Sequence, residues 1–304
     1  KISFAGPGKK KHELTCAIAA GVILNMESEQ EMMLIAQCGE RLGITPKVAI
    51  RVNPNFELKS SGMKMGGGSK PFGVDAERVP DMLKQLHALG LELIGFHIFS
   101  GSQNLNAEAI QEAHTQTIQL GIQLAEQAPT SVKLLNIGGG FGVPYFPGDQ
   151  ALNLPVIGEN LQKLMPVIKR QLPQAQIVIE LGRYMVAEAG IYVCRVLERK
   201  LSRGHTFLIT DGGLHHHLAA SGNFGQVIRK NYPVIIGNKV HGTEKEVVSV
   251  VGPLCTPLDM LADRLSMTKA SIDDLVVVLQ SGAYGMTASP TAFLNHPPPT
   301  EVLV

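Results

Sequence analysis

Short apolar runs alternate with longer mixed stretches over the first two-thirds of the chain. The runs are rich in β-branched residues, as buried strands are, and the stretches between them repeat apolar residues at helical spacing. The predicted strands cover residues 2–4, 22–24, 48–52, 93–98, 134–137 and 177–180. The predicted helices cover residues 28–42, 76–89, 107–127 and 157–171. Ser28 and Glu31 form a capping-box pattern at the first of these helices. The alternation predicts βα units around a parallel sheet.

The pattern changes after Gly190, where strand-like runs follow one another without regular helices between them. These runs cover residues 191–199, 206–210, 234–236, 246–251 and 275–279. We therefore predict two domains, a βα domain over residues 1–190 and a mostly β domain over residues 191–304. The chain begins inside an apolar run, so we expect its true N-terminus to lie upstream.

Composition narrows the possible functions. The 304 residues are 44% hydrophobic and carry 27 basic against 26 acidic side chains, a net charge of +1. This balance does not favour a nucleic-acid binder, and no apolar run approaches the ~20 residues that span a bilayer. Four cysteines without paired spacing indicate neither a disulfide framework nor a zinc site, and Cys16, Cys38 and Cys194 are interpreted as small buried residues. We expect a cytoplasmic protein.

Two neighbouring strands end in residues that could hold an anion. Gly138, Gly139 and Gly140 follow the strand at 134–137, and glycines let backbone N–H groups approach an oxyanion closely. The next strand ends in Glu180, and Arg183 follows three residues later. The glycines could also form only a tight corner, and the two charged residues could form a structural ion pair.

Other candidates are less specific. His97 and Phe99 share one face of their strand, although a single strand histidine is more often a core residue than a catalyst. His215, His216 and His217 suggest a metal site, but three consecutive residues cannot all point one way, so no metal is predicted. The glycine-rich stretch at residues 59–70 is either a flexible loop or a lid or interface loop.

Taken together, the motifs GGGFG, ELGR, VVGPLCTPLD, SGAYG and PPPTEVLV resemble the fold-type III pyridoxal-phosphate (PLP) decarboxylases, the group of diaminopimelate and ornithine decarboxylases. The resemblance runs along essentially the whole chain and keeps the motif order. It implies an eight-stranded (βα)8 TIM-type barrel that binds PLP, followed by a β domain. It also implies a homodimer with shared active sites.

The resemblance assigns a cofactor site position by position. The residues at the phosphate group and beside it are Gly138, Gly139, Gly140, Gly182, Arg183, Tyr284 and Ser102. Glu180 corresponds to the carboxylate that faces the pyridine nitrogen and keeps it protonated. Phe99 stands where the family usually has a histidine stacked on the ring, with His97 on the same strand face.

Three further residues come from the same resemblance. Cys255 corresponds to a cysteine that is offered across the dimer interface and returns a proton to the substrate after decarboxylation. Asp259 corresponds to an aspartate that pairs across subunits with a loop lysine, here Lys70. Thr256 replaces an acidic residue that meets the distal ammonium of diamino substrates. Lysine, ornithine and diaminopimelate are therefore poor candidate substrates.

The family's PLP-binding lysine lies in a VKAN-like motif on the first barrel strand, and this sequence contains no such motif. The GGG and ELGR strands are the fifth and sixth here, whereas barrels often bind phosphate after strands seven and eight. We expect two more βα units, about 60 residues at ~30 per unit, to precede the chain.

The stretches ELKSSGMKMGGG, GFHIFSGSQ and DGGLHHHLAASGNFG resemble an exopolysaccharide (exosortase-associated) and secondary-metabolite branch, some members of which act on carrier-linked aminoacyl groups. We therefore predict decarboxylation of an amino acid or an aminoacyl group, free or carrier-linked. One alternative is an amino-acid racemase on the same barrel, although Cys255 suits a decarboxylase better. The other is a non-catalytic homologue that binds a partner protein.

Overall fold

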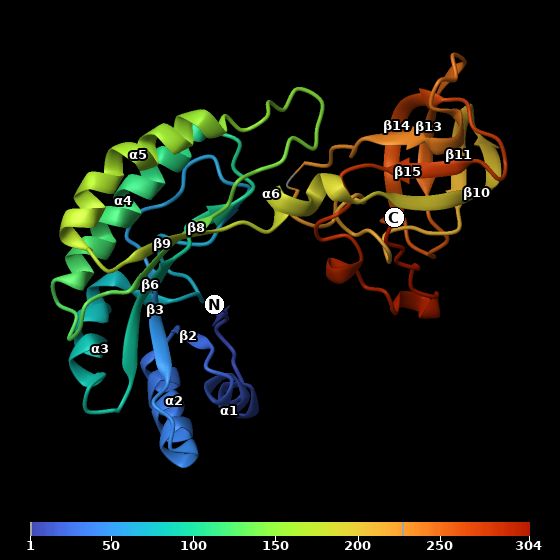
Figure 1. The fold of residues 1–304 in the computed structure, drawn as a ribbon. Helices are drawn as coiled ribbons and strands as arrows, with labels where there is room; N and C mark the ends of the chain where they lie inside the picture. The colour runs from blue at the N-terminus through green and yellow to red at the C-terminus, as the bar shows by residue number, and fades with distance from the viewer. Residues whose placement is uncertain (1, 227) are drawn as a thin grey trace. The chain divides into compact units, whose positions relative to one another are not determined.

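A computed structural model describes residues 2–226 and 228–304 (Figure 1). The chain forms two compact units. The first runs up to Gly142 and resumes over Leu152–Leu181, and the second contains Val143–Ala151 and Gly182–Val304. The domain boundary expected at residue 190 stays a prediction.

The first unit is built on a curled parallel sheet. Its strands are β1 (Ser3–Phe4), β2 (Ile23–Met26), β3 (Lys47–Asn53), β5 (Val74–Asp75), β6 (Glu92–Ile98), β8 (Leu134–Gly139) and β9 (Gln176–Glu180). The strand order is β1-β2-β3-β6-β8-β9, with β5 beside β3, and every pair is parallel. Each predicted strand occurs within two residues of its expected bounds. A separate short ribbon pairs β4 (Met63–Lys64) with β7 (Gly101–Ser102).

Helices lie along the outer side of this sheet (Figure 1). They are α1 (Lys11–Ala19), α2 (Glu29–Leu42), α3 (Val79–Gln85), α4 (Ala107–Ala125) and α5 (Leu154–Gln171). One half of the predicted capping box of α2 is confirmed, because Ser28 Oγ accepts a hydrogen bond from the Glu31 N–H at 3.1 Å. The Glu31 carboxylate instead accepts the Glu27 N–H, at 2.7 Å. The helix predicted over residues 76–89 is shorter than expected. It begins as a 3₁₀ turn over Ala76–Arg78, and the α-helix starts at Val79, which places Pro80 in the first turn, where a proline is best tolerated.

Strand alternation sorts the side chains of the sheet into two layers. Leu24, Ile50 and Phe96 are fully buried in the cluster that also contains helix residues such as Met32. A smaller cluster on the opposite face contains Ile23, Ala49, Ile94 and Leu134. Two residues further along β2, β3 and β8, the same face carries polar side chains, because positions i and i+2 of a strand point the same way.

The second unit is a β barrel-like domain. It contains β10 (Tyr192–Ser202), β11 (His205–Thr210), β12 (Val234–Ile236), β13 (Lys245–Val251), β14 (Met260–Thr268) and β15 (Leu275–Val278). They form one sheet in the order β12-β15-β10-β11-β13-β14, in which only β11 and β13 pair in parallel. The hydrophobic pattern missed β14, which carries charged residues and a positive φ at Arg264. The predicted fold class, a TIM-type barrel domain followed by a β domain, is confirmed in the form of a partial barrel.

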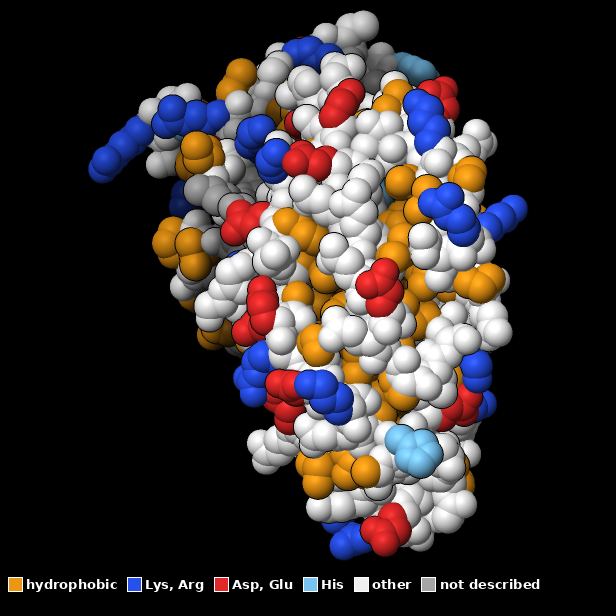
Figure 2. All heavy atoms as spheres, turned by 90° about the vertical axis from the view of Figure 1, so that its left-hand side faces the viewer, with side chains coloured by type: hydrophobic (Ala, Val, Ile, Leu, Met, Phe, Trp, Pro, Cys, Tyr) orange, Lys and Arg blue, Asp and Glu red, His pale blue; other side chains and the backbone are white. Residues whose placement is uncertain are grey.

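The outer helical face carries interspersed charges. Figure 2 shows lysine and arginine side chains mixed with acidic ones on this face, with hydrophobic side chains between them. Within residues 2–226 and 228–304, no helix is both long and apolar enough to cross a bilayer.

Candidate functional site

Polar side chains form a row across the inner face of the first unit's sheet. Arg51 on β3 pairs in register with His97 on β6, which pairs with Asn136 on β8. All three are buried, and Glu180 at the end of β9 joins them. His97 Nε2 lies 2.7 Å from Glu180 Oε1, and Asn136 Nδ2 donates to Glu180 Oε2 at 3.0 Å. The carboxyl ends of three neighbouring strands thus converge on one carboxylate.

Glu180 is held as an anion. Burial alone would raise its pKa, but hydrogen bonds from His97 and Asn136 and the charge of Arg51 together place the pKa below its usual range. The side chain remains 39% exposed. Each oxygen receives one of these hydrogen bonds, and because a carboxylate has about four lone-pair directions, it can accept a further N–H donor. A protonated ring nitrogen fits this acceptor.

The glycines after Leu134–Ile137 allow two strands to approach closely. A Cβ on Gly139 would lie 1.9 Å from the carbonyl oxygen of Glu180, its neighbour on β9. Gly140 has a φ of +82°, and its Cβ would lie 2.1 Å from the Gly101 oxygen. Gly138 has a φ of +74° and donates its N–H to Asn136 Oδ1 at 2.9 Å. No L-side chain fits at Gly139 or Gly140 without moving the backbone.

Ser102 and Phe99 lie beside this glycine turn. The Cα of Ser102 is 3.5 Å from the Cβ position of Gly140, and a Phe99 ring atom is 3.0 Å from that of Gly138. Ser102 Oγ is buried and has no hydrogen-bond partner among the described residues. An unpartnered buried hydroxyl beside a glycine turn fits a phosphate oxygen, and Phe99 offers an apolar ring face. The first unit therefore has donors and an acceptor that suit PLP.

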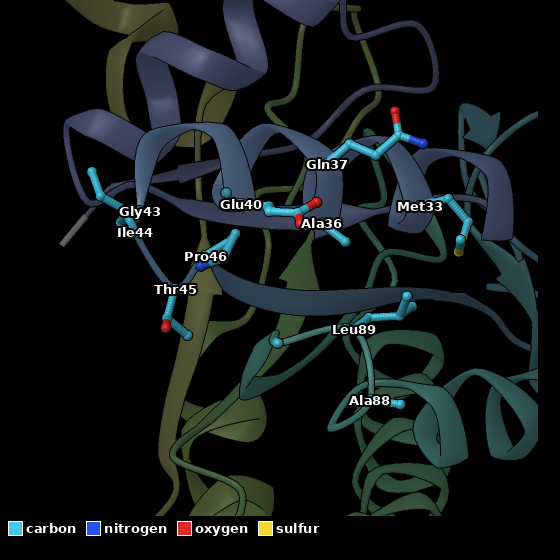
Figure 3. A pocket seen from close by; sticks show the side chains of 12 residues that line it. Met33, Ala36, Gln37, Glu40, Gly43, Ile44, Thr45, Pro46, Ala88 and Leu89 are labelled. Carbon is cyan, nitrogen blue, oxygen red and sulfur yellow. The ribbon is translucent and has the colours of Figure 1, made fainter.

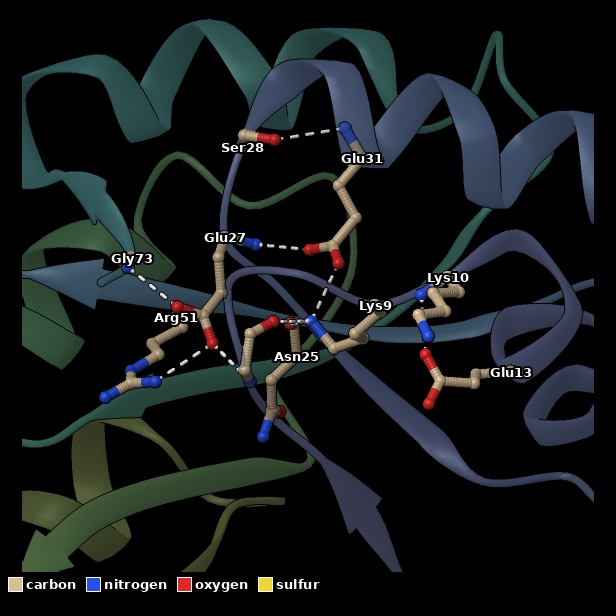
Figure 4. Close-up of polar contacts among 10 residues, drawn as sticks. Lys9, Lys10, Glu13, Asn25, Glu27, Ser28, Glu31, Arg51 and Gly73 are labelled. Carbon is tan, nitrogen blue, oxygen red and sulfur yellow. Dashed lines mark hydrogen bonds and ion pairs between the residues drawn. The ribbon is translucent and has the colours of Figure 1, made fainter. Parts of the chain in front are cut away.

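The sequence reasoning missed a second carboxylate at the same end of the sheet. Glu27, directly after β2, accepts from Gly6 N at 2.6 Å and Gly73 N at 3.0 Å, and from the Arg51 guanidinium at 2.9 Å (Figure 4). Glu27 therefore ties two loops to the residue whose charge acts on Glu180. The signal in the sequence was an acidic residue at a strand end, as at Glu180.

The Lys9 ammonium group belongs to this network, and each of its hydrogen-bond donors has an acceptor. Its ammonium group donates to Gly6 O at 2.7 Å, Asn25 O at 2.9 Å and Glu31 Oε1 at 2.8 Å. An ammonium has three donors, and all three are used. Lys9 is therefore a structural residue.

In the second unit, Arg183 and Tyr284 lie against each other. The Arg183 guanidinium carbon is 4.6 Å from the centre of the Tyr284 ring, and an Arg183 nitrogen donates to Tyr145 Oη at 3.1 Å. The Cβ position of Gly182 is 3.9 Å from the Tyr284 hydroxyl. Tyr284 has a φ of 54°, a left-handed conformation that costs a non-glycine residue about 1 kcal/mol or more. A cation and a phenol are thus available together for an anionic ligand.

The loop over residues 252–259 carries the remaining predicted residues. Cys255 is exposed, whereas Asp259 is only 2% exposed. Asp259 Oδ1 accepts from Leu214 N at 2.6 Å and Oδ2 from Leu254 N at 2.8 Å. Burial raises the pKa of Asp259, although these two donors oppose the change. Its pairing with Lys70 of a second chain stays a prediction.

The other residues singled out in the sequence are three cysteines and Lys70. Cys38 and Cys194 are buried as predicted, but the prediction for Cys16 is wrong, because it is exposed. Cys16 lies on α1, whose buried residues are Leu14, Ala17 and Ile18. Lys70 is partly exposed in the stretch between β4 and β5.

The three histidines do not converge on one point. His216 and His217 make separate hydrogen bonds, to Pro297 O and Ser281 Oγ. Among the described residues, no group of three His, Cys, Asp or Glu side chains has a metal-binding arrangement.

A hollow of about 520 Å³ lies at the opposite end of the first unit's sheet (Figure 3). It is lined by the last turns of α2 and by residues 43–46 and 88–90, which precede β3 and β6. Because barrel enzymes carry their chemistry at the carboxyl ends of the strands, this hollow is separate from the candidate site.

Comparison with known proteins agrees with this geometry. Residues 1–187 match the pyridoxal-dependent decarboxylase pyridoxal-binding domain, and residues 96–282 match the C-terminal sheet domain of the same enzymes. The chain is 40% identical to the L-glutamyl-[BtrI acyl-carrier protein] decarboxylase of Niallia circulans, over 99% of this chain and 72% of that protein. It is 31% identical to the diaminopimelate decarboxylase of Aquifex aeolicus, over 100% of this chain and 70% of that one.

A solved structure shows the same fold. A mutant diaminopimelate decarboxylase from Helicobacter pylori, complexed with L-lysine, superimposes with a TM-score of 0.85 at 26% identity. The match covers 98% of this chain and 72% of that structure. The chain is therefore a PLP-dependent carboxy-lyase and belongs to the fold-type III PLP-dependent decarboxylases, the family of diaminopimelate and ornithine decarboxylases.

Proposed function

We propose that the protein decarboxylates an aminoacyl substrate without a distal ammonium group, in the form of a glutamyl-type group linked to a carrier protein. The 40% identity with a decarboxylase of a carrier-linked glutamyl substrate supports this proposal. The resemblance of the stretches ELKSSGMKMGGG, GFHIFSGSQ and DGGLHHHLAASGNFG supports a role in exopolysaccharide or secondary-metabolite synthesis, and we propose that the protein acts in the cytoplasm.

The observation that carries the substrate proposal is the loop at residues 252–259. Thr256 follows Cys255, and its hydroxyl oxygen receives the Leu258 N–H at 3.3 Å. Asp259 is the one carboxylate of this loop, and both of its oxygens already accept backbone N–H groups. The loop therefore offers no free negative charge to a distal ammonium, and the absence of such a charge favours a substrate with an acidic or amide-linked end.

The residues of this chain hold the cofactor and move the proton. Bound PLP supplies a ring that accepts the electrons left when CO₂ departs. Glu180, an anion, holds a proton at the ring nitrogen. Ser102, Arg183, Tyr284 and the glycine turn would bind the phosphate group, and Phe99 would offer an apolar face to the ring. His97 keeps Glu180 in place. The Cys255 thiol then gives a proton to the carbon that has lost CO₂.

We further propose a homodimer in which Cys255 of one chain serves the site of its partner. Its exposure in the described structure is consistent with such a contact. No residue of this chain matches the family's VKAN motif, and we assign none of its lysines to the covalent link with PLP.

A substrate panel tests the proposal. Carbon dioxide release by the full-length holoenzyme is measured with glutamyl-loaded carrier protein, free glutamate, diaminopimelate, lysine and ornithine. We expect the loaded carrier to give the highest kcat/KM, by at least about 100-fold, because binding energy from the carrier adds to the transition state. Faster turnover of a diamino acid would contradict the proposal.

Changing Thr256→Glu sharpens the test. The new carboxylate should raise activity toward lysine relative to the loaded carrier, whereas Leu258→Glu, on a side chain that is 56% exposed in the same loop, should not. An identical substrate profile for all three proteins would remove Thr256 from substrate selection.

A further inference from the structure

The segment DGGLHHH at residues 211–217, here called the histidine segment, has no place in the mechanism above. Its three histidines are buried, at 0%, 9% and 1% exposure. A buried polar group is costly unless it is hydrogen-bonded, so the partners of these rings show what the segment does. Within the described residues, His216 and His217 have hydrogen-bond partners whereas His215 has none, and the partner of His217, Ser281, belongs to the loop that carries Tyr284.

The hydrogen bonds of His217 define its protonation. Its Nδ1 accepts from the Ala220 N–H at 3.1 Å, so the proton of the neutral ring is on Nε2. Nε2 therefore donates to Ser281 Oγ at 2.9 Å, and Ser281 Oγ donates to Val278 O at 2.9 Å. Burial lowers the pKa of His217 to about 4, which keeps the ring neutral. Ser281 opens the SGAYG loop that carries Tyr284.

That loop needs to be held in place. Tyr284 has a φ of 54°, a conformation that persists only where surrounding contacts enforce it. On one side the loop borders a cavity of about 270 Å³, which Tyr192, His216, His217 and Thr287 also line. On the side of the cavity, no packed side chains of the described residues hold the loop in place. The Ser281 N–H bond to Gly190 O at 2.8 Å fixes its entry, and the His217 bond fixes the side chain.

The same segment reaches the Cys255 loop. Leu214, inside the segment, and Leu254, directly before Cys255, donate their N–H groups to the two oxygens of Asp259. A Cβ on Gly213 would lie 2.1 Å from Asp259 Oδ1, and one on Gly252 2.3 Å from Oδ2. Both backbones approach the carboxylate so closely that glycine is required.

His216 makes a third connection. Its Nε2 lies 2.8 Å from Pro297 O, and since a carbonyl can only accept, Nε2 carries the proton. Nδ1 then accepts from the Tyr192 hydroxyl at 3.0 Å. The C-terminal stretch after Pro297 is thereby attached to the start of β10.

We propose that the histidine segment is a positioning platform, in which His217 holds the loop of Tyr284 in its phosphate-binding conformation through Ser281. This inference rests on the proposed function, because the role of Tyr284 belongs to it. His217 acts through another residue and is a positioning residue.

Paired substitutions test the platform in the full-length protein, with PLP as the probe. His217→Gln keeps a donor near the position of Nε2, whereas His217→Asn keeps only an acceptor near Nδ1. We expect His217→Asn to raise the PLP dissociation constant roughly tenfold, because a buried hydroxyl loses its donor, and His217→Gln to restore most of the affinity. The ³¹P chemical shift of bound PLP should move in His217→Asn and return toward the wild-type value in His217→Gln. Ser281→Ala should weaken PLP binding as His217→Asn does.

His205→Asn is the matched control. His205 Nε2 lies 2.9 Å from Ser249 Oγ in the same unit, a second histidine–serine pair away from these loops. We expect the control to leave the PLP affinity and the ³¹P shift unchanged. Equal loss of PLP in His205→Asn and His217→Asn would overturn the inference, as would a wild-type dissociation constant in both His217→Asn and Ser281→Ala.

Tyr284→Phe separates the inference from the function on which it rests. If Tyr284→Phe weakens PLP binding and neither His217→Asn nor Ser281→Ala does, the platform is wrong and the role of Tyr284 stands. If Tyr284→Phe binds PLP as the wild type does, the role of Tyr284 in the proposed function is wrong.

Discussion

The first unit carries its proposed site residues at strand ends, whereas the second carries them on loops. Gly139 and Glu180 are neighbours on β8 and β9, so backbone pairing sets their distance. Tyr284 and Cys255 lie in loops whose conformation depends on side-chain hydrogen bonds from distant segments. A sheet therefore positions the proposed site residues of the first unit, and buried polar side chains position those of the second.

This difference has an energetic side. A strand end inherits the rigidity of the whole sheet, and removing one side chain there changes chemistry more than structure. A loop held by one buried carboxylate or imidazole loses its shape when that group loses a partner, at about 1–3 kcal/mol per unsatisfied group. Substitutions in the first unit should affect catalysis or folding sharply, and those in the second should affect loop order.

The largest effect is expected at Glu180. Glu180→Gln keeps the size of the side chain but removes the negative charge that His97, Asn136 and Arg51 stabilise. We expect kcat/KM to fall roughly a thousandfold, because a preorganised charge at the reacting group is lost. Steady-state CO₂ release measures it, with Glu92→Gln, at the start of β6, as the control. An activity within tenfold of the wild type would mean that Glu180 is structural.

Gly139→Ala tests whether the sheet positions the proposed site residues of the first unit. The new methyl group would overlap the Glu180 carbonyl of β9, so β8 and β9 would have to separate. We expect a loss of about 3 kcal/mol in the free energy of unfolding, measured by urea titration. Gly158→Ala in α5 is the control, because nothing lies within 4 Å of its Cβ position, and it should be neutral or slightly stabilising. Equal stability of the two variants would mean that the turn is loose.

The difference between strand ends and loops also explains which site residues could be predicted from the sequence. The parallel strands, the glycine turn and Glu180 follow from local patterns, since each apolar run ends in the residues that reach the rim. Glu27 and Arg51 were missed because their importance comes from Gly6 and Gly73, which are distant in the sequence.

In the second unit the sequence identified motifs, but not which motifs would contact each other in the fold. The histidines of the segment 211–217 suggested a metal, and alternation argued against it, yet nothing local indicated that His217 would meet Ser281, 64 residues later. β14 was missed for a related reason, because its pairing with β13 overrides a mixed sequence with two register shifts. Contacts with residues distant in the sequence determine both the role of His217 and the formation of β14.

Asp259→Asn tests whether a buried carboxylate orders the loop of Cys255 in the second unit. An amide has one acceptor oxygen, so its NH₂ group would face the N–H of either Leu214 or Leu254. We expect a loss of about 2 kcal/mol in the free energy of unfolding and faster labelling of Cys255 by a thiol reagent, in a Cys16→Ser background. Asp273→Asn is the control, because that side chain is 79% exposed. Unchanged labelling of Cys255 would mean that Asp259 does not order its loop.

The smallest effect concerns a buried histidine of the first unit and its pH dependence. Burial among Ile110, Ala113 and Ile137 lowers the pKa of His114 to about 4. In the unfolded chain the ring binds a proton near pH 6.5, so unfolding becomes easier as the pH falls from 6.5 toward 4. The stability that the neutral ring contributes is complete above pH 6.5, and about 1 kcal/mol of it should be lost between pH 7.5 and 5.5. His114→Leu should remove this part of the slope in urea titrations at the two pH values.

Thr117→Val is the matched control for that measurement. Thr117 is buried on the same helix and lines the same small cavity, but it does not titrate in this range. The control should therefore keep the wild-type pH slope while its stability at pH 7.5 changes. Both nitrogens of His114 lack a hydrogen-bond partner among the described residues, so His114→Leu should also be at least as stable as the wild type at pH 7.5. A clear loss of stability there would show that the imidazole has a partner, such as a bound water, and that side-chain hydrogen bonds also order the first unit beside Gly139.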